Sequence, residues 1–300
     1  MLMGTLHLAA MLGLGYALRS RISINCDALS RYVMYVAMPA LALESLSVVA
    51  LSEGLLRAVL VYLLSMFIIS SAIYLIGRAF RLQRSMIHLL ILASNFSNTG
   101  FFGIPFIGST FQDPRALQLS VMLWMTTFVL SSLLCVYLLE GLRGDERLLG
   151  TIPRILRNPI VISVILGMSL NLMSLKIPEE LLYTLDSLGT TASPLALVSV
   201  GASLRASRSI SARTQGVLIS LRALLSPLLS LVLGSLAGLD RVKLEVLVLM
   251  SAMPAAVLLG VFSEEYDFRK EDVLPFITIS SLSAPLYLNG WLLLLKHLLP

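Results

Sequence analysis

Charged residues and cysteines are scarce in this sequence. Charged side chains make up 13% of its 300 residues, whereas a soluble domain carries about 25%. Hydrophobic residues account for 57%, so the composition predicts a polytopic membrane protein rather than a soluble one. Cys26 lies in a polar stretch and Cys135 in an apolar run, so the sequence has neither a disulfide framework nor a Cys/His metal pattern.

Sequence motifs for hydrolysis or nucleotide binding are also missing. The chain has no Walker loop, no His-Glu-x-x-His helix and no Gly-x-Ser-x-Gly elbow. His7, His88 and His297 occupy the ends of apolar segments and share no ligand spacing. We therefore expect no enzymatic activity, no cofactor and no metal site. The start of the chain has no basic residue before its apolar run, so it is interpreted as a retained first span, not a signal peptide.

The hydrophobic residues are arranged in ten segments, each close to the length of about 20 residues that crosses a bilayer. The seventh and ninth segments are the least hydrophobic. The ten predicted spans are 2–18, 33–51, 57–77, 86–109, 117–139, 159–175, 181–204, 216–237, 245–262 and 273–295.

The distribution of basic residues predicts the orientation of these spans. The first, third, fifth and seventh connecting loops each carry three or four arginines, whereas the even loops carry fewer basic residues. By the positive-inside rule the odd loops are cytoplasmic, and both termini lie outside. The net charge of +5 is thus explained by membrane topology, and no nucleic-acid partner is expected.

The fourth span contains residues that interrupt a helix. Its middle reads Asn95-Phe-Ser-Asn-Thr-Gly-Phe-Phe-Gly-Ile-Pro105. Lipid offers no partners for freed backbone groups, so a break inside a span is tolerated only where it lines a cavity or is buried in protein. The segment therefore indicates a binding site.

Matching features in the two halves predict an inverted repeat of five spans each, at 1–141 and 159–300, joined by a basic loop at 142–158. Pro39 in the second span corresponds to Pro194 in the seventh, and Pro105 in the fourth to Pro254 in the ninth. Inverted repeats with broken helices are typical of secondary transporters, which bind substrate near the midplane. If the fourth and ninth spans cross at Pro105 and Pro254, positively polarised half-helix starts would meet there and suit an anion.

The residues of these breaks resemble a known family. Asn98-Thr-Gly-Phe-Phe-Gly-Ile-Pro105 resembles the signature of the auxin efflux carrier family, the prokaryotic relatives of the plant PIN auxin exporters. Three further segments match in order along nearly the whole chain: Arg157–Val161, Ser193–Leu204 and Met253–Ala256. One departure is that the plant proteins carry an acidic and a basic residue in the third span, whereas residues 60–76 here have no charge.

The resemblance implies an all-α membrane protein of ten transmembrane helices, with broken, crossing fourth and ninth helices. It implies a scaffold of spans one, two, six and seven, and a mobile transport part made of the other six. It further implies an elevator-like carrier of a small organic anion, auxin-like or dicarboxylic, in the cell membrane. The partners it implies are the substrate, the lipid bilayer and a second copy of the chain in a homodimer.

The predicted substrate site centres on Asn98, whose buried amide can cap the broken backbone, bind a carboxylate, or do both. Thr99 and Gln118 are weaker candidates, because such residues often serve only as hydrogen-bond partners between helices. The full predicted set is Asn98, Thr99, Gly100, Gly103, Pro105, Gln118, Met253, Pro254 and Ala255.

Two charged residues inside spans have alternative interpretations. Glu44, five residues beyond Pro39, is a candidate proton carrier. An ionisable group inside a membrane is costly, so its presence there indicates a function. It can equally lie near the outer interface or accept a hydrogen bond in the scaffold. Arg222 can pair with an anion, but the favoured interpretation is that its long side chain extends to the cytoplasmic interface.

Two other functions fit parts of the pattern. A sodium-coupled carrier of the bile-acid type would need acidic ligands near the break, where only Asn95, Ser97, Asn98 and Thr99 are found. A membrane receptor would bind the same ligand without moving it, but the short loops leave no signalling domain.

Overall fold

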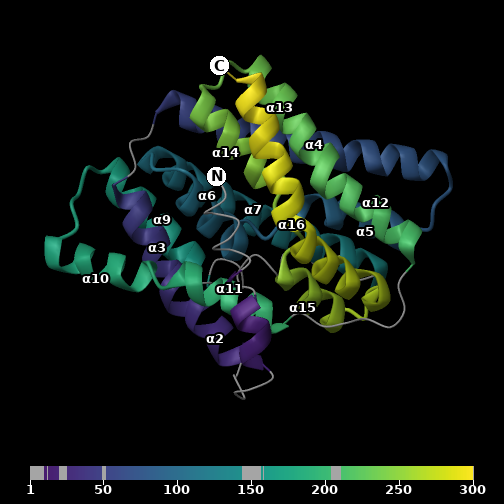
Figure 1. The fold of residues 1–300 in the computed structure, drawn as a ribbon, viewed down its shortest axis with the longest axis horizontal. Coiled ribbons are helices and arrows are strands. Elements are labelled where there is room, and N and C mark those ends of the chain that lie inside the picture. The colour runs from purple at the N-terminus through teal and green to yellow at the C-terminus, as the bar shows by residue number, and fades with distance from the viewer. Residues whose placement is uncertain are drawn as a thin grey trace.

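The computed structural model is helical throughout the part of the chain that it describes (Figure 1). In those ranges the only extended pairing is a single antiparallel bridge between Ser97 and Ala255. The predicted loop 142–158 and the start of the first predicted span lie mostly outside them. The structure describes residues 10–11, 13–19, 26–48, 52–143, 157, 159–203 and 211–299.

The first group of helices contains the second, sixth and seventh predicted spans and lies at the left and lower centre of Figure 1. In this group α3 packs mainly against α9 and α10, and α11 packs against α2. The seventh span was predicted as one segment, but the chain turns at 190–191 and divides it into two helices. The group comprises α2 (Cys26–Tyr32), η1 (Val33–Ala37), α3 (Met38–Ser47), α9 (Pro159–Leu172), α10 (Glu179–Gly189) and α11 (Ala192–Ser203).

The second group contains the helices of residues 53–143 and 212–298, which pack mainly against one another. Contacts of α11 with η2 and α6, and of α7 with α3 and α9, join it to the first group. Its members are α4 (Glu53–Ala79), α5 (Arg84–Asn95), η2 (Thr99–Gly103), α6 (Ile104–Thr110), α7 (Pro114–Arg143), α12 (Ala212–Ser220), η3 (Leu221–Leu225), α13 (Ser226–Leu236), α14 (Arg241–Ser251), α15 (Val257–Glu265) and α16 (Lys270–Leu298).

Within the described ranges, three helical stretches are long and apolar enough to cross a bilayer: Glu53–Ala79, Ala212–Leu236 and Lys270–Leu298. They coincide with the third, eighth and tenth predicted spans. Large apolar side chains on them face outward, and Leu236 and Leu286 are 80% and 78% exposed. Such exposure is unfavourable in water but favourable in lipid, so these surfaces fit a multi-pass membrane protein.

Three wide π-helical turns, η1, η2 and η3, each end two residues before a proline: Pro39, Pro105 and Pro227. A proline ring clashes with the carbonyl four residues earlier in a regular helix, and the wider turn accommodates the ring. The helix therefore continues through Pro105, from Thr99 to Thr110. The interruption predicted within Asn95–Pro105 lies at the start of that segment, at Phe96–Asn98, and not at its proline.

Candidate functional site

The two interrupted segments meet in a short antiparallel ribbon. The amide of Asn98 donates to the carbonyl of Pro254 (2.8 Å), and the amide of Ala256 donates to the carbonyl of Phe96 (3.0 Å). These bonds flank the bridge between Ser97 and Ala255. The segments thus cross at Ser97 and Ala255, because extended backbone pairs where both helices have ended. The predicted partner Pro254 is part of this crossing, whereas Pro105 lies beyond it in α6. We refer to Phe96–Asn98 with Pro254–Ala256 as the crossover.

Four half-helix ends surround the crossover. The helices α5 and α14 approach it with their carboxyl ends, at Asn95 and Ser251. The helical stretch η2–α6 and the helix α15 leave it with their amino ends, at Thr99 and Val257. The first amides of a helix have no acceptor within the helix and carry a partial positive charge. The departing ends therefore favour an anionic group.

Unpaired polar groups lie at the start of η2. Asn98 caps this helix, since its Oδ1 accepts a hydrogen bond from the amide of Phe101 (3.2 Å). Its Nδ2 is buried and has no hydrogen-bond partner in the described ranges, and the same holds for the hydroxyls of Ser97 and Thr99. Buried polar groups nearly always have partners, so three orphans together indicate a place for a polar ligand or ordered water. Asn98 thus has the structural role predicted for it and keeps a free donor for a second one.

The carboxyl ends are held by Arg222, which is 2% exposed. Its Nε donates to the carbonyl of Met253 (2.8 Å), its Nη2 to that of Ser251 (2.8 Å) and its Nη1 to that of Ser94. The favoured prediction, that this side chain extends to the cytoplasmic interface, is wrong. The reason is that the carbonyls freed by two broken helices offer an interior arginine enough acceptors.

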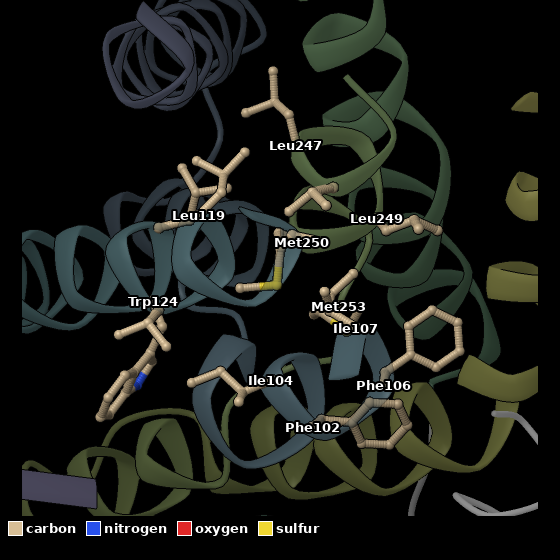
Figure 2. Close-up of a cluster of buried hydrophobic side chains, with 14 of the residues drawn as sticks. Phe102, Ile104, Phe106, Ile107, Leu119, Trp124, Leu247, Leu249, Met250 and Met253 are labelled. Atoms are coloured by element: carbon tan, nitrogen blue, oxygen red, sulfur yellow. The ribbon is translucent and has the colours of Figure 1, made fainter. Parts of the chain in front are cut away.

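Close packing at the crossover explains the two glycines of the signature. A Cβ atom at Gly100 would overlap Nε1 of Trp124, a residue of α7. A Cβ atom at Gly103 would lie 2.8 Å from the sulfur of Met250. Figure 2 shows Phe102, Ile104 and Phe106, from the same helical stretch, in the hydrophobic cluster with Met250 and Met253. The glycines therefore let η2 approach α7 and α14 closely.

The structure brings together most of the predicted site. Asn98, Pro254 and Ala255 form the crossover ribbon, Thr99 and Gly100 start η2, and the carbonyl of Met253 binds Arg222. Gly103 packs nearby on α14.

The two remaining predicted site residues are Pro105 and Gln118. Pro105 is buried in the first turn of α6, and Gln118 is half-buried near the start of α7. The structure adds Ser131, whose hydroxyl donates to the carbonyl of Asn95 (3.1 Å), and Trp124. The sequence contained no signal for either, because each lies in the uninterrupted apolar run of α7.

Glu44 lies in the first group of helices. It is half-buried on α3, and its Oε2 accepts a hydrogen bond from the hydroxyl of Ser45 (3.0 Å). The main neighbours of α3 are α9 and α10. Its geometry is compatible with both interpretations of this residue, the proton carrier and the scaffold hydrogen bond.

The site contains no cluster of metal-binding side chains within the described ranges, where no three His, Cys, Asp or Glu residues come together. The crossover instead offers amide and hydroxyl groups, an arginine and helix starts. This set can bind an anionic group by hydrogen bonds and charge.

The chain is similar in sequence to proteins named as transporters. An uncharacterized transporter of Methanocaldococcus jannaschii is 28% identical over 89% of each chain. An uncharacterized transporter of Methanothermobacter thermautotrophicus is 28% identical over 89% of this chain and 88% of its own length. A Rhizobium meliloti protein named "Putative malonate transporter" is 25% identical over 89% of this chain and 86% of its own length.

The profile of the membrane transport protein family matches twice, at residues 2–147 and 146–292. The two matches together cover nearly the whole chain. The first match contains Phe96–Asn98 and the second contains Pro254–Ala256, the two strands of the crossover. The chain therefore belongs to the membrane transport protein family, that of the auxin efflux carriers.

Proposed function

We propose that this protein is a secondary transporter that carries a small organic anion through alternating exposure of the crossover. The observation that carries the proposal is the unpaired Nδ2 of Asn98 at the start of η2, beside the ribbon that joins two broken helices. A carboxylate accepts hydrogen bonds from such an amide and is attracted by the helix starts.

The proposed substrate class is a carboxylic acid of auxin-like or dicarboxylic type. A carboxylate is the common anionic group of both, and the groups at Ser97–Thr99 are donors suited to it. The printed name of the Rhizobium relative mentions malonate, a small dicarboxylate, which supports the same class.

The proposed architecture has ten spans in two inverted repeats, 1–141 and 159–300, with 142–158 as a cytoplasmic loop and both termini outside. The double match of the family profile supports the repeat. The separate packing of the two helix groups supports a scaffold of spans one, two, six and seven and a transport part of spans three to five and eight to ten. In this proposal the transport part carries the crossover across the membrane in an elevator-like movement, and the scaffolds of two copies form a homodimer.

Transport in reconstituted liposomes tests the proposal. Labelled malonate and indole-3-acetate are offered under an inward proton gradient, a sodium gradient and no gradient. We expect uptake of at least one acid above that of protein-free liposomes. A strict sodium requirement would favour a sodium-coupled carrier instead. Binding in detergent without uptake under any gradient would favour a receptor and contradict the proposal.

Glu44 is the proposed proton carrier if uptake responds to the proton gradient. A protonated Glu44 is required, because an ionised carboxylate would repel an anionic substrate. The Glu44→Gln variant is then expected to transport the substrate at a rate that does not respond to the proton gradient. A variant that still responds would assign Glu44 to the scaffold hydrogen bond with Ser45.

A further inference from the structure

Arg222 connects the two broken helices through their carboxyl ends. Ser94 belongs to the last turn of α5, and Ser251 is the last residue of α14. One guanidinium donates to both carbonyls and also to that of Met253, next to the crossover. A lysine has one nitrogen and cannot reproduce this three-way contact, whereas the planar guanidinium presents five donors.

The charge of Arg222 is not balanced by an acid in the described part of the chain. The ionisable side chains that interact with it are the phenols of Tyr62 and Tyr287, and neither is a carboxylate. Arginine stays protonated in proteins. A full positive charge therefore lies inside the transport part, with helix carbonyls as its counterparts.

The partial charges of the half-helix ends allow a simple sum. Each carboxyl end carries about −0.5 of an elementary charge and each amino end about +0.5. The two carboxyl ends and two amino ends at the crossover would cancel. Because Arg222 offsets the two carboxyl ends, about one positive charge remains, carried by the starts of η2 and α15.

We propose that Arg222 is a positioning residue that sets the charge preference of the crossover, by holding and neutralising the two carboxyl ends so that the amino ends attract one carboxylate. This inference rests on the proposed function and narrows it, because the residual charge matches one carboxylate. A monoanion is then the preferred form of the substrate. A dianion brings a second charge that the crossover leaves without a counterpart.

A series of equal-sized ligands tests this inference on the purified full-length protein. Malonate, malonamic acid and malonamide carry about two, one and no negative charges at neutral pH. Indole-3-acetate and indole-3-acetamide form a second pair, with one charge and none. The affinities of wild type, Arg222→Met and Arg222→Lys are measured for all five compounds.

We expect the wild type to bind each monoanion more tightly than its neutral partner and malonamic acid more tightly than malonate. Arg222→Met should lose roughly 10- to 100-fold of its affinity for a monoanion, while its affinity for the neutral amide stays the same. Arg222→Lys should be less stable but keep the preference for a monoanion, because it keeps the charge.

Three results would overturn the inference. One is an unchanged anion preference in Arg222→Met, with the proposed function intact. Another is tighter binding of malonate than of malonamic acid by the wild type. This measurement needs no variant, so it tests the inference even if Arg222→Met fails to fold. The third is wild-type protein that binds none of the carboxylates, which would overturn the proposed function as well.

Discussion

At the scale of single residues, the two polar atoms of the Asn98 side chain have different surroundings. Asn98 uses its oxygen to cap η2 and leaves its amide nitrogen unpaired. The sequence predicted that this amide caps the broken backbone, binds a ligand, or does both; the cap is confirmed, and ligand binding stays a prediction. The unpaired hydroxyls of Ser97 and Thr99 give the amide two polar neighbours.

Substitution Asn98→Asp separates the cap from the ligand contact. Aspartate is as good a cap as asparagine, but it has no amide donor and adds a negative charge. We expect the thermal midpoint of the purified protein to change little and its affinity for a carboxylate to fall about 10- to 100-fold. Asn171→Asp is the matched control, since Asn171 donates to the carbonyl of Ser47 in the first group of helices, away from the crossover. Equal affinity losses in both variants would contradict a ligand role for Asn98.

The two signature glycines should differ in their tolerance of a methyl group. Gly100→Ala places Cβ against the rigid indole of Trp124, so we expect a loss of stability of about 1–3 kcal/mol. Gly103→Ala meets the flexible side chain of Met250 and should cost less. Thermal unfolding of both variants in the same detergent gives the comparison. A larger loss for Gly103→Ala would contradict the packing described here.

At the scale of helices, wide turns before prolines keep the helix continuous, and the break lies elsewhere. The sequence predicted an interruption in the segment that ends at Pro105, but a π-helical turn carries the helix through this proline, as others do at Pro39 and Pro227. The true break at Phe96–Asn98 could not be located from residue types, because it depends on pairing with Pro254–Ala256. A distant partner of this kind leaves only a weak trace in a single sequence.

Pro227 in the eighth span leaves the carbonyl of Ala223 without a donor in its own helix, and a side chain of α16 supplies the hydrogen bond. Pro227 has no amide hydrogen for the carbonyl of Ala223, and Nε1 of Trp291 on α16 donates to that carbonyl instead (2.7 Å). Trp291→Phe should therefore cost about 1–3 kcal/mol from the unpaired carbonyl alone, in addition to lost packing.

A double-mutant cycle isolates this bond. Pro227→Ala restores an amide that can donate to the carbonyl of Ala223, so Trp291→Phe should cost less in the Pro227→Ala background than in wild type. The readout is the thermal midpoint of the four proteins. Strict additivity would show that Pro227 and Trp291 are not coupled through the carbonyl of Ala223 and would contradict this account.

At the scale of the whole molecule, hydropathy and charge predicted the membrane class, and the signature residues predicted the family. Three predicted spans coincide with long apolar helices, and both interrupted spans contain half-helices. The contact of Arg222 with the ends of the broken helices was not predicted, because hydropathy treats a charge inside a span only as a cost. Only the folded chain brings the carbonyls of Ser94, Ser251 and Met253 to one side chain.

The central claim is that the crossover binds an anion and carries it across the membrane. Counterflow in liposomes tests it most directly, because exchange needs no knowledge of the coupling ion. Liposomes loaded with unlabelled carboxylate are diluted into a trace of the same labelled acid, with wild type and Asn98→Asp compared. We predict transient accumulation of label with wild type and none with Asn98→Asp. Carboxylate binding by the wild type without any counterflow would contradict the account.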